Sequence, residues 1–238
     1  MDIVRSFTFV FEDKDWVAKL LIAAGILLVG SLFAWLLLIP LIAAIALLTG
    51  YSLEITRRVI HGHPQPLPEW DNWGGLLTDG LKGLAIVLVY FLPLILLSLC
   101  LGVPTVLFNS DSSLSLQQVG TLLGLFTSCL DFLWIIAASL LLPVAFGFYV
   151  AEGEIRAAFS FGRVWAFFRD HISIYLITLL MSWVAAVIGD LGSLVCGLGW
   201  FVTMPYSWMV TGHLYGQAYL EAGGQALPPA LAGAEEAA

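Results

Sequence analysis

Long apolar runs separated by short polar segments dominate the pattern along the chain. Four runs stand out, at about 16–53, 81–108, 117–151 and 172–220. A helix needs about 20 apolar residues to cross a hydrocarbon core of roughly 30 Å, so each run is long enough to cross a membrane. The pattern therefore predicts an all-α fold, a polytopic bundle of transmembrane helices.

The first run raises the question of how often the chain crosses. At about 1.5 Å per residue, residues 16–53 would form a rod nearly twice as long as the bilayer is thick, so they form either one overlong helix or a hairpin of two. A hairpin with its turn near Gly30-Ser31 gives six spans and puts every lysine and arginine on one face. A single crossing gives five spans and splits the basic residues six to three. The nine basic residues fall in three groups: Arg5, Lys14 and Lys19; Arg57, Arg58 and Lys82; Arg156, Arg163 and Arg169.

Basic residues concentrate on the cytoplasmic side of membrane proteins, which favours the hairpin and places both termini in the cytoplasm. The bacterial or archaeal cell membrane, the inner membrane where there are two, is the predicted location. The predicted spans are 17–32, 33–55, 81–104, 129–151, 172–190 and 195–219.

Three prolines suggest an internal repeat. Pro40, Pro143 and Pro205 fall in the second, fourth and sixth predicted spans, and an aromatic-rich amphipathic stretch precedes each odd-numbered span. We therefore expect three helical-hairpin repeats with interfacial amphipathic helices. The favoured interpretation of the prolines is a kink whose free backbone groups are satisfied by neighbours. The alternative is a hinge or binding site at the membrane midplane, as in transporters built from repeats. The predicted organisation is one transmembrane domain, 1–220, with repeats at about 1–60, 61–155 and 156–220, followed by a flexible tail rich in Ala, Gly and Glu, 221–238.

Composition excludes several classes of protein. Of 238 residues, 60% are apolar and 11% are charged, too apolar for one soluble core of this size. The net charge of −8 argues against a nucleic-acid partner. We recognise no catalytic or cofactor motif and expect no cofactor or metal. Three cysteines, Cys100, Cys129 and Cys196, are predicted in the outer part of the protein, where a disulfide and unpaired packing are both compatible with the sequence.

Two polar residues inside the apolar runs are candidates for a ligand or ion site. Asp131 lies in the third run, and an intramembrane carboxylate is a functional candidate by default. Counting outward from Pro143, however, places it about 18 Å away, near a solvated helix end. Residues 117–130 then form either an amphipathic lid or the start of one long tilted helix. His213 in the last run is expected to be a hydrogen-bonded packing residue, with a proton relay as the alternative.

The most distinctive segment is PLPEWDNWGGLLTDGLKG at 66–83. Its prolines favour an extended start, its tryptophans suit the headgroup layer, and its glycines allow close approach to another backbone. Asp71 is expected to cap a following short helix. The residues of this interfacial signature are Pro68, Glu69, Trp70, Asp71, Trp73 and Asp79.

Together with Gly50-Tyr51 and Arg57, the segment at 67–83 resembles the prokaryotic membrane proteins of domain-of-unknown-function family 4013. The resemblance covers about residues 1–222 and implies a multi-pass membrane protein. It implies no activity, so it assigns no catalytic residue.

Three functions remain open at this point. The favoured one is a protein without enzymatic activity that acts as scaffold, accessory subunit or lipid-interacting protein, with membrane lipids, other subunits or further copies of itself as partners. The first alternative is a small transporter or channel-like protein that uses Asp131 and the midplane prolines. The second is a membrane enzyme acting on lipids.

Overall fold

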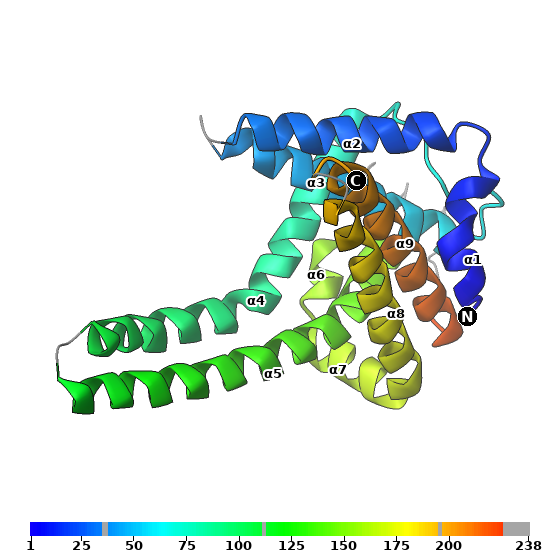
Figure 1. Ribbon diagram of the computed structural model, residues 1–238. Coiled ribbons are helices and arrows are strands. Elements are labelled where there is room, and N and C mark those ends of the chain that lie inside the picture. The colour runs from blue at the N-terminus through cyan, green and yellow to red at the C-terminus, as the bar shows by residue number, and fades with distance from the viewer. Residues whose placement is uncertain (35–37, 111–112, 195–196, 226–238) are drawn as a thin grey trace. The chain divides into compact units, whose positions relative to one another are not determined.

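The computed structural model describes residues 1–34, 38–110, 113–194 and 197–225. Every regular element in these ranges is helical, which confirms the all-α prediction (Figure 1). The elements are α1 (Ile3–Thr8), η1 (Phe9–Glu12), α2 (Trp16–Leu32), α3 (Ile39–Ile60), α4 (Trp73–Asn109), α5 (Leu114–Glu152), α6 (Ile155–Ala158), α7 (Phe161–Asp170), α8 (Ile172–Leu191), η2 (Gly192–Leu194) and α9 (Trp200–Glu221).

Four of the described helical segments are long and apolar enough to cross a membrane: α3, α4, α5 and the stretch Ile172–Leu194. A fifth is added if Ile3–Glu12 and Trp16–Leu32, which meet at an angle of 96°, form one broken span. These are the helices of a membrane protein. α2 alone is too short to count as a span, and α9, the sixth span predicted from the sequence, is not among the candidates. The sixth span therefore stays a prediction.

The apolar run 16–53 contains two helices. α2 ends at Leu32 and α3 begins at Ile39, and the two pack against each other. A Cβ on Gly30 would lie 2.5 Å from the Cβ of Ala44, so the backbones approach closely at this point. The turn predicted near Gly30-Ser31 is placed too early, because both residues still belong to α2.

Pro40 does not interrupt a span, contrary to the sequence prediction. It lies in the first turn of α3, where the missing N–H of proline costs no helical hydrogen bond. Pro143 and Pro205 do lie inside helices, in α5 and α9.

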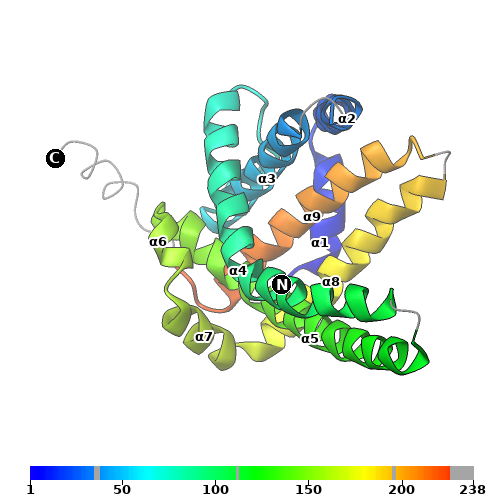
Figure 2. The same cartoon turned by 90° about the vertical axis from the view of Figure 1, so that its left-hand side faces the viewer.

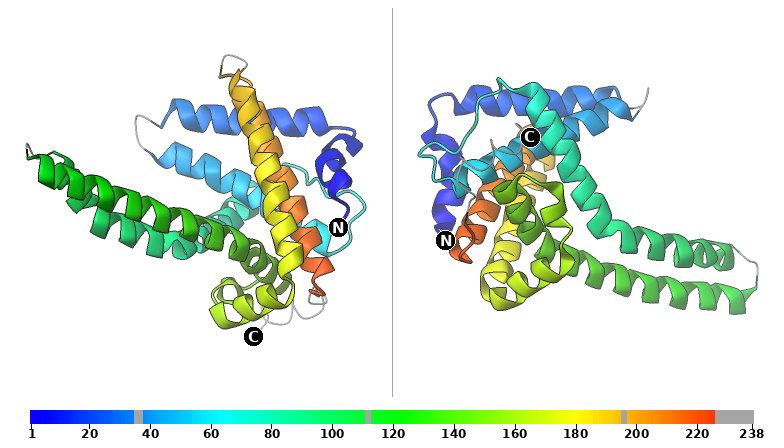
Figure 3. Two further views of the ribbon diagram at one scale, coloured as in Figure 1. Left: turned by 60° about the horizontal axis from the view of Figure 1, so that its bottom comes forward. Right: turned by 180° about the vertical axis from the view of Figure 1, so that it is seen from behind.

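The chain divides into two compact units. The first, here called the core unit, is formed by the described residues of Met1–Ile86 and Pro143–Ala238. In this unit α9 packs against α1, α2, α3 and α8 (Figures 2 and 3). α9 meets α3 through small and hydroxylated residues: the Thr56 hydroxyl donates to the Gly212 carbonyl at 2.8 Å, and the Ser52 hydroxyl donates to the Trp208 carbonyl at 2.9 Å.

The second unit, Val87–Leu142, is here called the hairpin unit. It consists of the second part of α4 and the first part of α5, which lie side by side (Figure 1). Each part exceeds the roughly 30 Å of a hydrocarbon core, at about 35 Å and 43 Å for 1.5 Å per residue. Residues 117–130 belong to the continuous helix α5, so the chain forms the long helix and not the separate lid.

Candidate functional site

The signature segment begins as a loop and ends as the start of α4. Asn72, and not Asp71 as expected, caps this helix: its side-chain oxygen accepts a hydrogen bond from the Gly75 N–H at 3.0 Å. The helix it caps is α4 with its full length, so the short interfacial helix expected here is absent from the described chain. Asp71 lies one residue outside the cap and is exposed.

Two glycines let α3 and α4 cross with their backbones in contact. A Cβ built on Gly50 would lie 1.9 Å from the carbonyl oxygen of Leu76, and a Cβ on Gly80 would lie 1.7 Å from that of Ala46. Real Cβ atoms do not come this close to backbone oxygens, so only glycine allows the crossing. This confirms the close backbone approach that the glycines of the segment predict.

Aromatic stacking fixes the loop onto α2 and α3. The ring of Trp70 stacks on Tyr51, with centroids 4.3 Å apart and planes 13° apart. The Tyr51 hydroxyl donates to the Pro68 carbonyl at 2.8 Å, and the Trp70 indole N–H donates to the Lys19 carbonyl at 3.2 Å. The ring centroids of Trp70 and Trp73, the first residue of α4, lie 5.3 Å apart, so the two tryptophans predicted to anchor the segment are neighbours.

A cluster of charged side chains from α3 and α4, together with a tyrosine of α5, lies beside this loop. Arg57 pairs with Glu54 and, through Nη2, with Asp79 Oδ2 at 2.8 Å. The other carboxylate oxygen of Asp79 accepts from the Tyr149 hydroxyl at 3.0 Å. Arg58 pairs with Glu54 at 3.2 Å.

The cluster borders a polar cavity of about 250 Å³. Four acidic and two basic side chains line it, so the site can meet both signs of charge, but both arginines are already engaged by carboxylates. The lining residues are Glu54, Arg57, Arg58, Pro68, Glu69, Asp71, Asn72, Gly75, Leu76 and Asp79.

A buried lysine ties the N-terminal segment to the signature. Lys19 is 3% exposed, and its Nζ pairs with Asp13 at 2.8 Å and with Glu69. Burial alone would raise the pKa of Asp13, but hydrogen bonds from Lys19 and from the Asp15 N–H outweigh it and hold that pKa below its usual range. From the sequence, Lys19 is a topology signal only, because neither Asp13 nor Glu69 is linked to it by a recognisable motif.

The hairpin unit contains the second candidate site. Asp131 lies near the middle of α5, partly buried, and the Ser98 hydroxyl of α4 is 3.3 Å from each of its carboxylate oxygens. Asp131 therefore faces a polar partner on the neighbouring helix, which hydropathy alone could not identify.

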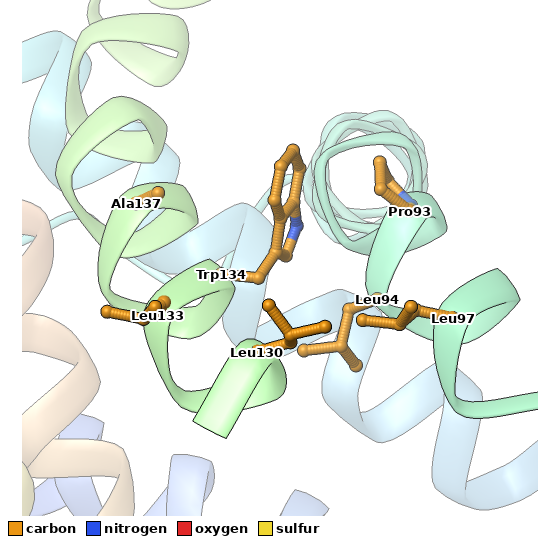
Figure 4. Close-up of a pocket in the computed structure, with 7 residues that line it drawn as sticks. All are labelled: Pro93, Leu94, Leu97, Leu130, Leu133, Trp134 and Ala137. Carbon is orange, nitrogen blue, oxygen red and sulfur yellow. The ribbon is translucent and has the colours of Figure 1, made fainter. Parts of the chain in front are cut away.

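An apolar pocket of about 450 Å³ is formed by the same two helices, and its lining includes Leu97 and Leu130, the sequence neighbours of Ser98 and Asp131. In Figure 4 the indole of Trp134 lies between the two helices, and its N–H donates to the Tyr90 carbonyl at 3.0 Å. Pro93 follows in α4 and has no N–H to donate to the Val89 carbonyl four residues earlier, so Trp134 bonds to the carbonyl adjacent to the one that the proline leaves without its helical donor. The pocket is lined by Pro93, Leu94, Leu97, Leu130, Leu133, Trp134 and Ala137.

His213 is buried in the core unit between α1, η1 and its own helix α9. It is 2% exposed, its Nδ1 lies 3.0 Å from the Ser6 hydroxyl, and its ring stacks on Phe9 with centroids 4.3 Å apart. The described ranges contain no cluster of three or more potential metal ligands. Cys100 and Cys129 are exposed and unpaired, and Cys196 lies outside the described residues.

These features define a helical membrane protein whose most elaborate local structure is built on the signature segment. A family model described as "Protein of unknown function (DUF4013)" matches residues 33–198, more than half of the chain, and the chain belongs to this family. The match includes the signature and Asp131 but excludes Ser6 and His213, and it is narrower than the resemblance at 1–222. Comparisons with curated proteins and with solved structures give no significant match.

Proposed function

We propose that the protein is an integral membrane protein without enzymatic activity, which acts as a scaffold or accessory subunit in contact with lipids. The observation that carries this proposal is the pairing of charges at the signature. Arg57, Asp79 and Lys19 hold helices and loop together, so these charges serve the fold. A catalytic acid or base needs access to a substrate proton, which such pairing restricts.

The exposed surface of the hairpin unit supports the same proposal. Large apolar side chains are exposed along both of its helices, which suits contact with acyl chains or with other membrane helices. Among those with more than half of their surface exposed are Leu88, Leu96, Leu99, Val103, Val106, Leu107, Leu122, Leu125, Phe126, Phe132 and Leu133.

The proposed topology has six spans arranged as three helical hairpins, with both termini in the cytoplasm. Its support is the sequence of helix pairs, α2 with α3, α4 with α5, and α8 with α9, together with the grouping of the basic residues. Membrane lipids and other membrane-protein subunits are the proposed partners.

The test is isolation of the full chain from its native membrane in polymer-bounded lipid nanodiscs, followed by mass measurement. We expect a particle that holds the 25.9 kDa chain with a second membrane protein in fixed stoichiometry. Recovery of the chain alone, as a monomer, would contradict the proposal.

A transporter is the second candidate, because Asp131 and Ser98 lie on two helices that are each apolar enough to span. Proteoliposomes with a pH-sensitive or cation-sensitive dye test it. Flux that requires the wild-type chain and stops in Asp131→Asn would favour transport over the scaffold.

A further inference from the structure

The carboxylate of Asp131 is poorly satisfied by its surroundings. One serine hydroxyl, from Ser98, is placed 3.3 Å from both carboxylate oxygens, and a hydroxyl has a single proton to donate. An ionised carboxylate has acceptor sites for about four hydrogen bonds. Among the described residues of the hairpin unit, Ser98 alone is seen to bond this carboxylate, which leaves most of the acceptor capacity unused there.

The hairpin unit also supplies no positive charge. Residues 87–142 contain no lysine, arginine or histidine, and none of the ion pairs between described residues includes Asp131. Charged side chains within membrane spans pair with opposite charges because an isolated charge in hydrocarbon is costly. A second copy of the hairpin unit is a poor partner, since it would bring the same carboxylate to the contact.

The same two helices that carry Ser98 and Asp131 also form an apolar pocket. The 450 Å³ pocket opens between α4 and α5, and Leu97 and Leu130, the sequence neighbours of Ser98 and Asp131, belong to its lining. Figure 4 shows leucines from both helices converging there around Trp134. Apolar side chains of a third helix would fill such a groove, as helices do in helix-in-groove recognition.

We propose that this groove binds a transmembrane helix of another membrane protein, and that a lysine or arginine of that helix pairs with Asp131. The inference rests on the proposed function and names the chemistry of the partner. The carboxylate selects the position of the basic residue along the helix, and the apolar pocket supplies the packing.

The experiment uses the full chain in lipid vesicles with synthetic leucine-rich transmembrane peptides as probes. Energy transfer between labelled protein and labelled peptide reports binding. One peptide carries a single central lysine, the second carries leucine at that position, and the third carries the lysine two turns nearer one end. We expect the central-lysine peptide to bind about tenfold more tightly than the leucine peptide, an effect within the range of polar contacts between membrane helices.

Asp131→Asn should abolish the lysine preference, while Asp190→Asn, which removes an exposed carboxylate of α8, should leave it unchanged. Asp131→Lys should reverse the preference, so that a central-glutamate peptide binds best, and this gain of binding could not arise from misfolding. Equal binding of lysine and leucine peptides to the wild-type chain would overturn the inference, and so would a lysine preference that survives Asp131→Asn. If the native complex forms but does not depend on Asp131, the scaffold proposal stands and this inference fails.

Discussion

The core unit and the hairpin unit are stabilised by different kinds of contact. In the core unit, helices meet through glycines in backbone contact, such as Gly80, and through ion pairs between elements, such as Arg57 with Asp79. All nine basic residues belong to this unit. In the hairpin unit, two long apolar helices share a few polar contacts, and Asp131 has no ionic partner among the described residues.

This difference indicates where each unit's specificity comes from. Ion pairs and backbone contacts of the core unit form only in one geometry, so they define its structure internally. Apolar surface is non-directional, so the hairpin unit depends on what surrounds it, whether lipid or another helix. The predictions below test this contrast from the largest expected effect to the smallest.

Gly80→Ala should give the largest loss of stability. Its new Cβ would meet the Ala46 carbonyl oxygen, a backbone atom that can move away only by separating α3 from α4. We expect a loss of about 3 kcal/mol, seen as a lower thermal midpoint in detergent by circular dichroism.

Gly102→Ala in the hairpin unit is the matched control. A Cβ on Gly102 meets no atom within 4 Å, so the helix should tolerate alanine or gain up to about 1 kcal/mol. Equal losses of stability for Gly80→Ala and Gly102→Ala would show that the close crossing of α3 and α4 does not require glycine.

Neutralising one carboxylate in each unit should have unequal effects. Asp79→Asn leaves Arg57 without its partner on α4, and we expect a loss of about 2 kcal/mol, because the groups are only partly buried. Asp131→Asn removes an unpaired charge and should change stability by less than about 1 kcal/mol. Thermal unfolding of both variants at pH 7 measures the contrast. A larger loss of stability for Asp131→Asn than for Asp79→Asn would contradict the view that the core unit depends more on its carboxylate than the hairpin unit does.

Removing one aromatic hydrogen-bond donor from each unit should have a smaller effect. Tyr51→Phe loses the bond to the Pro68 carbonyl but keeps the stacking on Trp70, and should cost about 1 kcal/mol. Trp134→Phe loses the bond to the Tyr90 carbonyl and part of the pocket wall, so its cost should be at least as large. Proteolysis rates at the loop 61–72 should rise for Tyr51→Phe and not for Trp134→Phe.

The smallest effect concerns pH. Because the pKa of Asp13 is lowered in the folded protein, its ionic contact with Lys19 stabilises the fold above the ordinary pKa and is lost as pH falls through the lowered value. The midpoint difference between wild type and Asp13→Asn should therefore be constant near neutral pH and shrink below about pH 4. A difference that grows on acidification would contradict the pairing.

Much of the fold follows from the sequence for physical reasons. Hydrophobic runs predict the helices, and the grouping of the basic residues favours a break in the run 16–53. Length alone does not require that break, because α4 and α5 are continuous helices of similar length. The position of the break was less predictable: no residue stops α2 at Gly30-Ser31, and Pro40 starts a helix as readily as it kinks one.

The candidate sites were only partly predictable. The glycines of the signature predict a close approach to another backbone, and its tryptophans predict that the segment is anchored at the membrane interface. The partners Tyr149, Lys19 and Ser98 are distant in sequence, and no periodicity links them to Asp79, Glu69 and Asp131. Counting from Pro143 predicts how far along the helix Asp131 lies, but it does not identify Ser98 as the side chain that faces it.

Cysteine labelling tests the central claim, a multi-pass protein with its basic residues on one face, most directly. Single cysteines replace Ser31, His63, Ser110 and Ser160 in a chain whose native cysteines are changed to serine, and an impermeant maleimide is added to intact cells. We predict labelling at 31 and 110 from outside, and at 63 and 160 only after permeabilisation. Labelling of 63 from outside, or of 31 and 63 on the same side, would contradict the account.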